Sequence, residues 1–340
     1  MSASLPVGKL PFDLLAMLLA DAPVSDPRVL LGPGIGLDCA IIELGETLLV
    51  FKSDPITFAT EDIGWYLVQV NSNDIATTGA TPRWLMVTAL LPEENTTVET
   101  VRRITLRLYE ACRGLGISLI GGHTEITYGI ERPILSGTMV GEVTRERLVL
   151  PSGARPGDKV LLTKGVPIEA TAILGREFAD QLSGALSPAE IQQAQSYLYE
   201  PGISILRDAQ IATAAGNVTA MHDPTEGGLV TALWELAEAS RCTILFDPTG
   251  VHIPALSARL CDFYGLDPLC AIASGALLLT VDPTDAPQII SALQQKGIDC
   301  AEIGQVESGP PHVRQRTSCG LQPLPRPARD EIARLFERSK

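Results

Sequence analysis

The hydrophobic pattern predicts two successive sets of strands and helices along the chain. In the first set, apolar residues alternate with polar ones in short strands and recur at helical spacing in longer segments. The predicted strands are Asp38–Leu44, Thr47–Ser53, Arg83–Leu91, Ile117–Ile120 and Pro133–Val143, and the predicted helices are Leu10–Leu19, Ile63 to Gly79, and Val98–Leu115. The first two strands form a hairpin that turns at Gly45-Glu46. This order predicts an α+β domain with a mainly antiparallel or mixed sheet.

The second set begins after Leu150–Asp158, a segment rich in turn-forming residues that is typical of a domain linker. The predicted strands are Lys159–Thr163, Val218–Met221, Thr243–Phe246, Ser274–Val281 and Ala301–Val306, and the helices are Ile168 to about Ala215, a helix through Ala239, Pro254–Tyr264 and Ala286–Lys296. The pattern therefore predicts one domain over residues 1–150, a second α+β domain over 151–310, and a loosely ordered tail over 311–340 that ends in a short helix.

The predicted helix after Ile63 is apolar on most sides, yet it carries polar residues in its middle. Asn71 and Asp74 are three positions apart, so they project from one face of the helix. A buried carboxylate is costly unless it is hydrogen-bonded, paired or bound to a cation. From this segment alone, a structural carboxylate and a metal or phosphate site remain equally open.

Two further acidic residues mark the ends of the first hairpin. Asp38 stands at the entrance of its first strand and Asp54 at the exit of its second. These ends lie side by side in an antiparallel hairpin, so the two carboxylates can approach each other. With Asp74 they form a set of oxygen ligands of the kind that Mg²⁺ prefers.

Paired glycines occur at two other places that suit a ligand. Gly121 and Gly122 follow a predicted strand, and His123, Thr124 and Glu125 place polar groups directly after them. Farther on, the sequence His222-Asp-Pro-Thr-Glu-Gly-Gly-Leu229 leads into a helix. Asp223 or Thr225 can cap that helix, and a helix start carrying Gly227 and Gly228 is also suited to bind an anion.

Composition narrows the classes of function. The net charge of -14, without any basic run, argues against a nucleic-acid partner, and a phosphate ligand would need local donors or Mg²⁺. We expect no membrane association, because no apolar run is long enough to span a bilayer. The seven scattered cysteines and the absence of a signal-peptide pattern lead us to expect a reduced, cytoplasmic location.

In their order along the chain, these motifs resemble the AIR synthetase-like (PurM-type) ATP-binding superfamily. The resemblance extends from Gly8-Lys9 to about Val306. It is carried by Gly8-Lys9, Gly36-Leu-Asp-Cys-Ala40, Ser53-Asp54, Asn73-Asp-Ile-Ala followed by Gly79-Ala-Thr-Pro82, Gly121-Gly-His-Thr124, and His222 to Leu229. The wording of the motifs is closest to the branch of the hydrogenase expression/formation protein HypE and of AIR-synthase-related proteins.

The resemblance implies a two-domain fold whose first domain forms a β-barrel across a homodimer, with ATP and Mg²⁺ bound near the dimer interface. It implies that Lys9, Asp74 and His123 are catalytic, and that Asp38, Asp54 and Asp74 bind the metal. The residues that it implies for cofactor binding are Asp38, Asn71, Gly121, Gly122, Thr124, Asp223, Thr225, Gly227 and Gly228. Family chemistry is phosphoryl transfer from ATP to an oxygen of a small substrate, in some members followed by dehydration.

Three departures from the family pattern leave the subclass open. Leu37 replaces an acidic residue that many relatives carry, and His123 stands where an acidic residue is common. The last cysteine is Cys319, so the C-terminal cysteine carrier of the hydrogenase-maturation branch does not transfer as it stands. The alternatives are an ATP-dependent dehydratase or phosphotransferase, a thiamine-monophosphate-kinase-like enzyme, and a nucleotide-binding maturation module that acts through a partner without turnover.

Overall fold

The computed structural model describes residues 5, 10–34, 36–57 and 62–338. Its first domain contains α1 (Phe12–Ala20), β1 (Val29–Leu31), β2 (Ala40–Leu44), β3 (Thr47–Ile56), α2 (Ile63–Thr77), β4 (Thr81–Pro92), α3 (Val98–Leu115), β5 (Ser118–Thr127) and β6 (Ile134–Thr144). Its second domain contains β7 (Lys159–Thr163), α4 (Ile168–Glu177), α5 (Ala179–Leu182), α6 (Pro188–Ser196), α7 (Leu206–Ala215), β8 (Val218–His222), α8 (Gly228–Ser240), β9 (Thr243–Phe246), α9 (Ala255–Tyr264), β10 (Leu278–Val281), α10 (Ala286–Gln294), β11 (Cys300–Glu307), β12 (His312–Thr317), β13 (Gly320–Pro323) and α11 (Ala333–Arg338). The predicted two-domain α+β architecture is confirmed.

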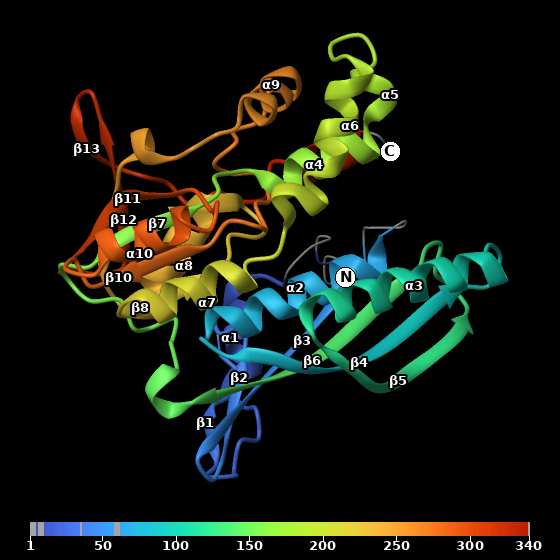
Figure 1. Cartoon of the computed structure of the whole chain (residues 1–340), viewed down its shortest axis with the longest axis horizontal. Helices are drawn as coiled ribbons and strands as arrows, with labels where there is room; N and C mark the ends of the chain where they lie inside the picture. The colour runs from blue at the N-terminus through green and yellow to red at the C-terminus, as the bar shows by residue number, and fades with distance from the viewer. Residues whose placement is uncertain (1–4, 6–9, 35, 58–61, 339–340) are drawn as a thin grey trace.

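The first sheet is mixed and is covered by helices on one face. Its strands lie in the order β1-β2-β3-β6-β4-β5, and all neighbours are antiparallel except β4 and β5. The helices α2 and α3 lie above the sheet in Figure 1, and none of the helices labelled there lies below β4 and β5. Buried residues of α2 and of the sheet, such as Leu67, Leu85 and Met139, form the core between them.

Helix α2 lies between the two domains and joins them. Its Asn73 is fully buried; the side-chain amide donates to the Ile203 carbonyl at 2.8 Å and accepts from the Ile205 amide at 3.0 Å. These bonds satisfy a polar side chain that would otherwise be costly to bury. The same helix therefore fixes the second domain against the first sheet.

The second sheet is packed between helices on both faces. Its strands lie in the order β13-β12-β9-β11-β7-β10-β8. Apolar residues of α8 pack on one face, and apolar residues of α7 and α10 pack on the other. Among the described helices, none is long and apolar enough to cross a membrane.

The expectation of a loosely ordered tail is wrong. Strands β12 and β13 extend the second sheet, and β12 pairs in parallel with β9. Beyond them, Ile332 and Leu335 are buried against the helices of the second domain. The many prolines and arginines of this segment led to the wrong prediction, because its few apolar residues show no clear pattern in the sequence.

The sequence predicted that the paired glycines of the first domain follow the end of a strand. That prediction is wrong. Strand β5 continues through them to Thr127, and its residues are exposed along nearly its whole length at the edge of the sheet. Gly122 has a φ of +147°, and a Cβ built there would lie 1.8 Å from the Val87 carbonyl oxygen of β4. A Cβ on Gly121 would meet nothing within 4 Å. Close backbone approach therefore requires a glycine at position 122 only.

We expect Gly122→Ala to destabilise the first domain by more than about 3 kcal/mol, because strands β4 and β5 must separate to admit the methyl group. Gly121→Ala is the matched control and is expected to cost less than about 1 kcal/mol. Urea unfolding of the two variants measures the difference. Equal stability of the two variants would contradict this account of the strand pairing.

Candidate active site

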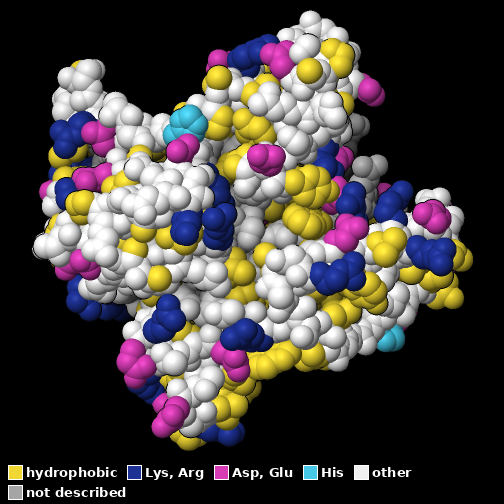
Figure 2. Space-filling view, in the orientation of Figure 1, with side chains coloured by type: hydrophobic (Ala, Val, Ile, Leu, Met, Phe, Trp, Pro, Cys, Tyr) yellow, Lys and Arg dark blue, Asp and Glu magenta, His cyan; other side chains and the backbone are white. Residues whose placement is uncertain are grey.

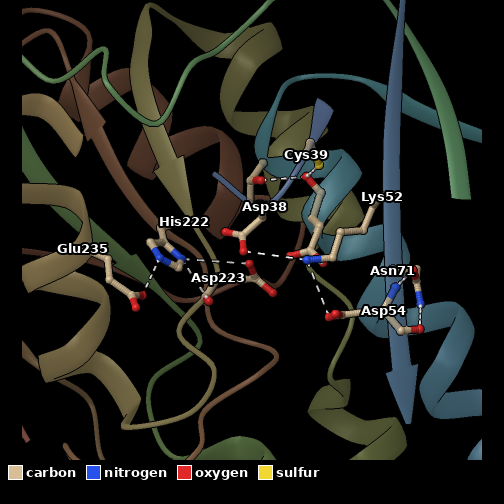
Figure 3. A network of polar contacts seen from close by, with 10 residues as sticks. Asp38, Cys39, Lys52, Asp54, Asn71, His222, Asp223 and Glu235 are labelled. Carbon is tan, nitrogen blue, oxygen red and sulfur yellow. Dashed lines mark hydrogen bonds and ion pairs between the residues drawn. The ribbon is translucent and has the colours of Figure 1, made fainter. Parts of the chain in front are cut away.

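A lysine lies at the centre of the three carboxylates that the sequence singled out. The Lys52 ammonium nitrogen is 3.0 Å from Asp74 Oδ2, 3.5 Å from Asp54 Oδ2 and 3.7 Å from Asp38 Oδ1. Figure 3 shows the side chains of Lys52, Asp38 and Asp54 converging at the seam between the domains. The sequence therefore correctly predicted that Asp38, Asp54 and Asp74 meet in space. It missed the cation between them.

Strand β3 places Lys52 and Asp54 on the helix-covered face of the sheet. Leu48, Val50 and Ile56 are buried on this face, and successive side chains of a strand alternate between faces. Lys52 therefore continues a row of buried apolar residues, with only 10% of its side chain exposed. A charge at a position that the alternation assigns to the core was the signal that could have identified it.

Asn71 positions Asp54 instead of reaching into the seam. Its side-chain oxygen accepts from the Asp54 amide at 3.1 Å, and its nitrogen donates to the Leu67 carbonyl at 2.9 Å. Asn71 is fully buried, so its polar atoms are occupied by the main chain of β3 and α2. These bonds give Asn71 a positioning role, and its contact with a cofactor stays a prediction.

The second domain contributes an acid and an ion pair to the same seam. His222 ends β8, and its Nε2 lies 2.9 Å from a carboxylate oxygen of Glu235 on α8. Its Nδ1 lies 3.1 Å from the Asp223 carbonyl oxygen and 4.0 Å from Asp223 Oδ1. Asp223 is 2% exposed, and its Oδ2 has no hydrogen-bond partner among the described residues. Figure 3 shows Asp223 turned toward the Asp38 and Lys52 side chains.

Burial and neighbouring charges shift the pKa values of this cluster. Burial and the charge of Asp223 raise the pKa of Asp74 well above its usual range, against the attraction of Lys52. Burial likewise raises the pKa of Asp223 to about 7, and the charge of His222 opposes the rise. Burial lowers the pKa of His222, but Glu235 outweighs it and raises the value to about 9. Asp223 can therefore exchange a proton near neutral pH beside the cations of Lys52 and His222.

Cys39 borders the cluster without belonging to its chemistry. The thiol donates to the Asp74 carbonyl oxygen at 3.3 Å and is 6% exposed. Burial raises its pKa well above the usual value, so the thiol remains neutral. A nucleophilic role would need a thiolate.

The carboxylates do not fit a bound Mg²⁺ in the arrangement that the structure gives them. Lys52 Nζ occupies the point between their oxygens, and a divalent ion placed there would meet a positive charge. Among the described residues, no group of three or more His, Cys, Asp or Glu side chains is arranged to hold a metal ion. The metal role of Asp38, Asp54 and Asp74 stays a prediction, and the geometry supplies a competing cation.

The other predicted residues lie apart from this cluster or outside the described residues. Lys9 falls in a part of the chain that the structure does not describe. His123 lies on the exposed edge strand β5, with its Nε2 2.9 Å from a Glu125 carboxylate oxygen. Gly121, Gly122 and Thr124 share that strand, which β6 and β4 separate from β3 within the sheet. Within one chain, this motif and the carboxylates therefore do not form a single site.

The start of α8 is occupied by the C-terminal segment. The Asp330 carboxylate accepts from the Gly227 amide at 2.6 Å, and the Gly228 amide donates to the Thr225 carbonyl at 2.9 Å. Neither Asp223 nor Thr225 caps the helix with its side chain, which corrects that expectation. The predicted anion site at Gly227 and Gly228 is thus filled by a carboxylate of the chain itself.

A further buried acid lies at the first turn of α4. Glu169 is 1% exposed, and its Oε2 has no hydrogen-bond partner among the described residues. Burial raises its pKa to about 7 from a usual 4.5, while hydrogen bonds from Ser274 oppose the rise. Between these two values the unfolded chain is ionised and the folded chain holds the proton. Stability is therefore lost as the pH rises through this range.

We expect the titration of Glu169 to lower the free energy of unfolding by about 3 kcal/mol between pH 4.5 and pH 7.5. Glu169→Gln should remove that contribution and leave a flatter profile. Urea unfolding at pH 5 and pH 8 provides the test, with the exposed Glu307→Gln as the control. A Glu169→Gln profile as steep as the wild-type profile would refute the assignment.

Comparison with known proteins supports the fold and the order of motifs. The model of the AIR synthase related protein N-terminal domain matches residues 36–143, and that of the C-terminal domain matches residues 155–315. The chain belongs to the AIR synthase related protein family. It is similar to a hydrogenase expression/formation protein of Methanocaldococcus jannaschii, with 28% identity over 317 residues that cover 89% of this chain and 90% of the relative.

It is also similar to the carbamoyl dehydratase HypE of Cupriavidus necator, with 29% identity over 278 residues that cover 78% of this chain and 74% of the relative. These relatives agree with the HypE-like motif wording of the sequence.

Solved structures of related proteins share the fold. HypE in complex with ATP matches with a TM-score of 0.70 and 24% identity over 92% of this chain and 90% of that one. A chain of a HypE–HypF complex matches with a TM-score of 0.72 and 21% identity over 92% and 99%. AaThiL complexed with AMPPCP and TMP matches with a TM-score of 0.69 and 22% identity over 89% and 91%.

Proposed function

We propose that the protein is an ATP-dependent enzyme of the HypE kind, which phosphorylates an oxygen of a small substrate and then releases phosphate to complete a dehydration. The named relatives that support this are a carbamoyl dehydratase and a hydrogenase expression/formation protein. A carbamoyl group is accordingly the proposed substrate group. ATP is the proposed phosphoryl donor, because a similar fold carries ATP in a HypE complex.

The observation that carries the proposal is the meeting of charged groups from both domains at one seam. Lys52 and three carboxylates come from the first domain, and Asp223 and the His222–Glu235 pair come from the second (Figure 3). Phosphoryl transfer is catalysed largely by fixed charges that position and stabilise the transferring group. An ammonium group and an imidazolium at this seam supply such charges.

The acids of the seam suit the dehydration step. After the substrate oxygen attacks the γ-phosphorus and ADP leaves, loss of phosphate from the activated oxygen requires removal of protons from the neighbouring nitrogen. Asp223 has a pKa of about 7, which lets it accept and release a proton near neutral pH. The Lys52 ammonium group, fixed by Asp74, then holds the phosphate-bearing end in position.

The test is ADP and phosphate release by the purified protein with ATP and Mg²⁺, alone and with a carbamoyl-carrying maturation protein. Partner-dependent release of both products is expected. Tight ATP binding without release of ADP under either condition would overturn the enzyme assignment and favour a nucleotide-binding maturation module. The related HypE–HypF complex is the reason for including a protein partner.

A thiamine-monophosphate-kinase-like activity is the second candidate, because AaThiL complexed with AMPPCP and TMP has a similar fold. The same assay with thiamine monophosphate separates the two. Substrate-dependent ADP formation without free phosphate would identify a kinase. Phosphate release in step with ADP would identify the dehydratase.

We further propose that the protein works as a homodimer in the cytoplasm. The uncovered face of the first sheet carries Phe51, Trp84 and Val140 in one transverse row, and strand β5 leaves its edge unpaired among the described strands. An apolar sheet face and an open strand edge both favour association with a second copy. The seven cysteines are all free thiols, which suits a reducing compartment.

Because the resemblance implies that ATP binds near the dimer interface, we propose that β5 of one copy lies near the carboxylate cluster of its partner. That arrangement would give His123, Thr124 and the paired glycines the nucleotide-binding role that the motif implies. Asp38 and Asp223 would then contact the same nucleotide from the other side.

A further inference from the structure

The lysine within the carboxylate cluster is the feature that neither the motifs nor the named relatives assign. Its ammonium group makes ion pairs with three carboxylates, at distances from 3.0 to 3.7 Å. Only 10% of its side chain is exposed, against 48% for Asp38 and 38% for Asp54. Lys52 and Asp74 are thus the two most buried groups of the cluster, and the more exposed carboxylates of Asp38 and Asp54 lie on its solvent side.

We propose that Lys52 is a built-in cation that takes the place of a divalent metal ion at this cluster, so that the free protein does not load a divalent ion there. The inference rests on the proposed function only in taking the cluster as part of the nucleotide site. The inference assigns Lys52 a role in cation specificity, because Lys52 determines whether the negative charge of the carboxylates is balanced by the chain or by a metal ion.

The geometry carries the inference through the shared point that the ligands surround. Oxygen atoms from β3, from α2 and from the turn before β2 converge on one ammonium nitrogen, as they would on a hard cation (Figure 3). Contacts that do not involve the Lys52 side chain hold these three elements together. The β2–β3 register aligns the strand ends, and Asn71 ties the Asp54 main chain to α2. The carboxylates therefore stay close together whatever cation lies between them.

Charge balance favours the lysine in the free protein. Three carboxylates surround the Lys52 ammonium nitrogen within 3.7 Å, so the cluster requires a cation and the chain itself supplies one. A divalent ion would have to displace a cation that is covalently attached to the site and always present.

Removing the ammonium charge should uncover a metal site. Lys52→Met keeps most of the side-chain volume, and Lys52→Thr also opens space for an ion and its water. We expect both variants to bind Mn²⁺ at least tenfold more tightly than the wild type in a titration without nucleotide, followed by electron paramagnetic resonance. Lys52→Arg keeps the charge and should behave like the wild type.

Two further variants and a second readout locate the effect and keep the test independent of folding defects. Adding Asp74→Asn to Lys52→Met should abolish the acquired Mn²⁺ site, since it removes the most buried ligand. Lys159→Met, which breaks an ion pair with Glu302 on the surface of the second domain, should leave Mn²⁺ affinity unchanged. Circular dichroism melting with and without Mn²⁺ gives a second readout, because a site formed only in the folded state raises the Tm of Lys52→Met and not that of the wild type.

Each possible result of the Mn²⁺ titrations either supports the inference or overturns it. Mn²⁺ binding by Lys52→Met, and by neither the wild type nor Lys52→Arg, supports the inference. Equal affinity of the wild type and Lys52→Met at a site lost with Asp74→Asn would overturn it, because the lysine would then not exclude the metal. Failure of every variant to bind Mn²⁺ would also overturn it, because the carboxylates would not form a latent metal site. None of these readings depends on ATP turnover.

Discussion

ATP turnover is expected to fall at least 100-fold, or about 2.7 kcal/mol in activation free energy, when Asp74 is replaced by asparagine. Asp74 is 4% exposed and forms the shortest ion pair of Lys52, at 3.0 Å. Asparagine keeps the shape but removes the charge that holds the ammonium group in place. Lys52 would then be drawn toward Asp54 and Asp38, whose oxygens lie farther out toward the solvent.

The measurement should separate binding from chemistry. ATP affinity, ADP formation and phosphate release are recorded for the wild type, for Asp74→Asn, and for Asp262→Asn, which changes an exposed aspartate of α9. We expect a loss of rate that exceeds any loss of affinity, because fixed charges act mainly on the transition state. Turnover within twofold of the wild type would show that the cluster is not the site of phosphoryl transfer.

Local patterning was sufficient to predict most elements of the fold. The strand ending at Thr163 and the helix Val98–Leu115 were predicted to the residue, because clear polar boundaries flank both. The β2–β3 hairpin was predicted from its turn, and its register brings the ends with Asp38 and Asp54 together as expected. Strand β5 was predicted too short, because glycines normally weaken a strand and the close contact with Val87 that favours Gly122 is not local.

The site was less predictable than the fold, because its key contacts join distant segments. Lys52 stands beside the Ser53-Asp54 motif, but its significance depends on contacts with Asp38 before β2 and Asp74 in α2, which only the folded chain brings together. Asp330 was assigned to a tail, although its carboxylate fills the start of α8 about a hundred residues earlier. Acidic residues were easier to identify, since an aspartate in an apolar helix requires a partner wherever that partner lies.

The second large effect that we expect concerns the oligomeric state, and it depends on the uncovered face of the first sheet. Phe51, Val140 and Trp84 pair across β3, β6 and β4, so their side chains form one row on the face without helices. Yellow side chains gather along the lower margin of the molecule in Figure 2, below the helices of the first domain. A dimer that buries this row would be disrupted by a carboxylate at its centre, since an unpaired buried charge is costly.

We expect the wild type to be a dimer of the 36.2 kDa chain at micromolar concentration. Val140→Glu should weaken dimerisation at least 100-fold, or about 2.7 kcal/mol. Val98→Glu is the matched control, because it makes the same change at an exposed position at the start of α3, where an acidic side chain suits the helix dipole. Light scattering over a concentration series measures all three proteins. A monomeric wild type at tens of micromolar, or a Val140→Glu variant as dimeric as Val98→Glu, would rule out this face as the dimer interface.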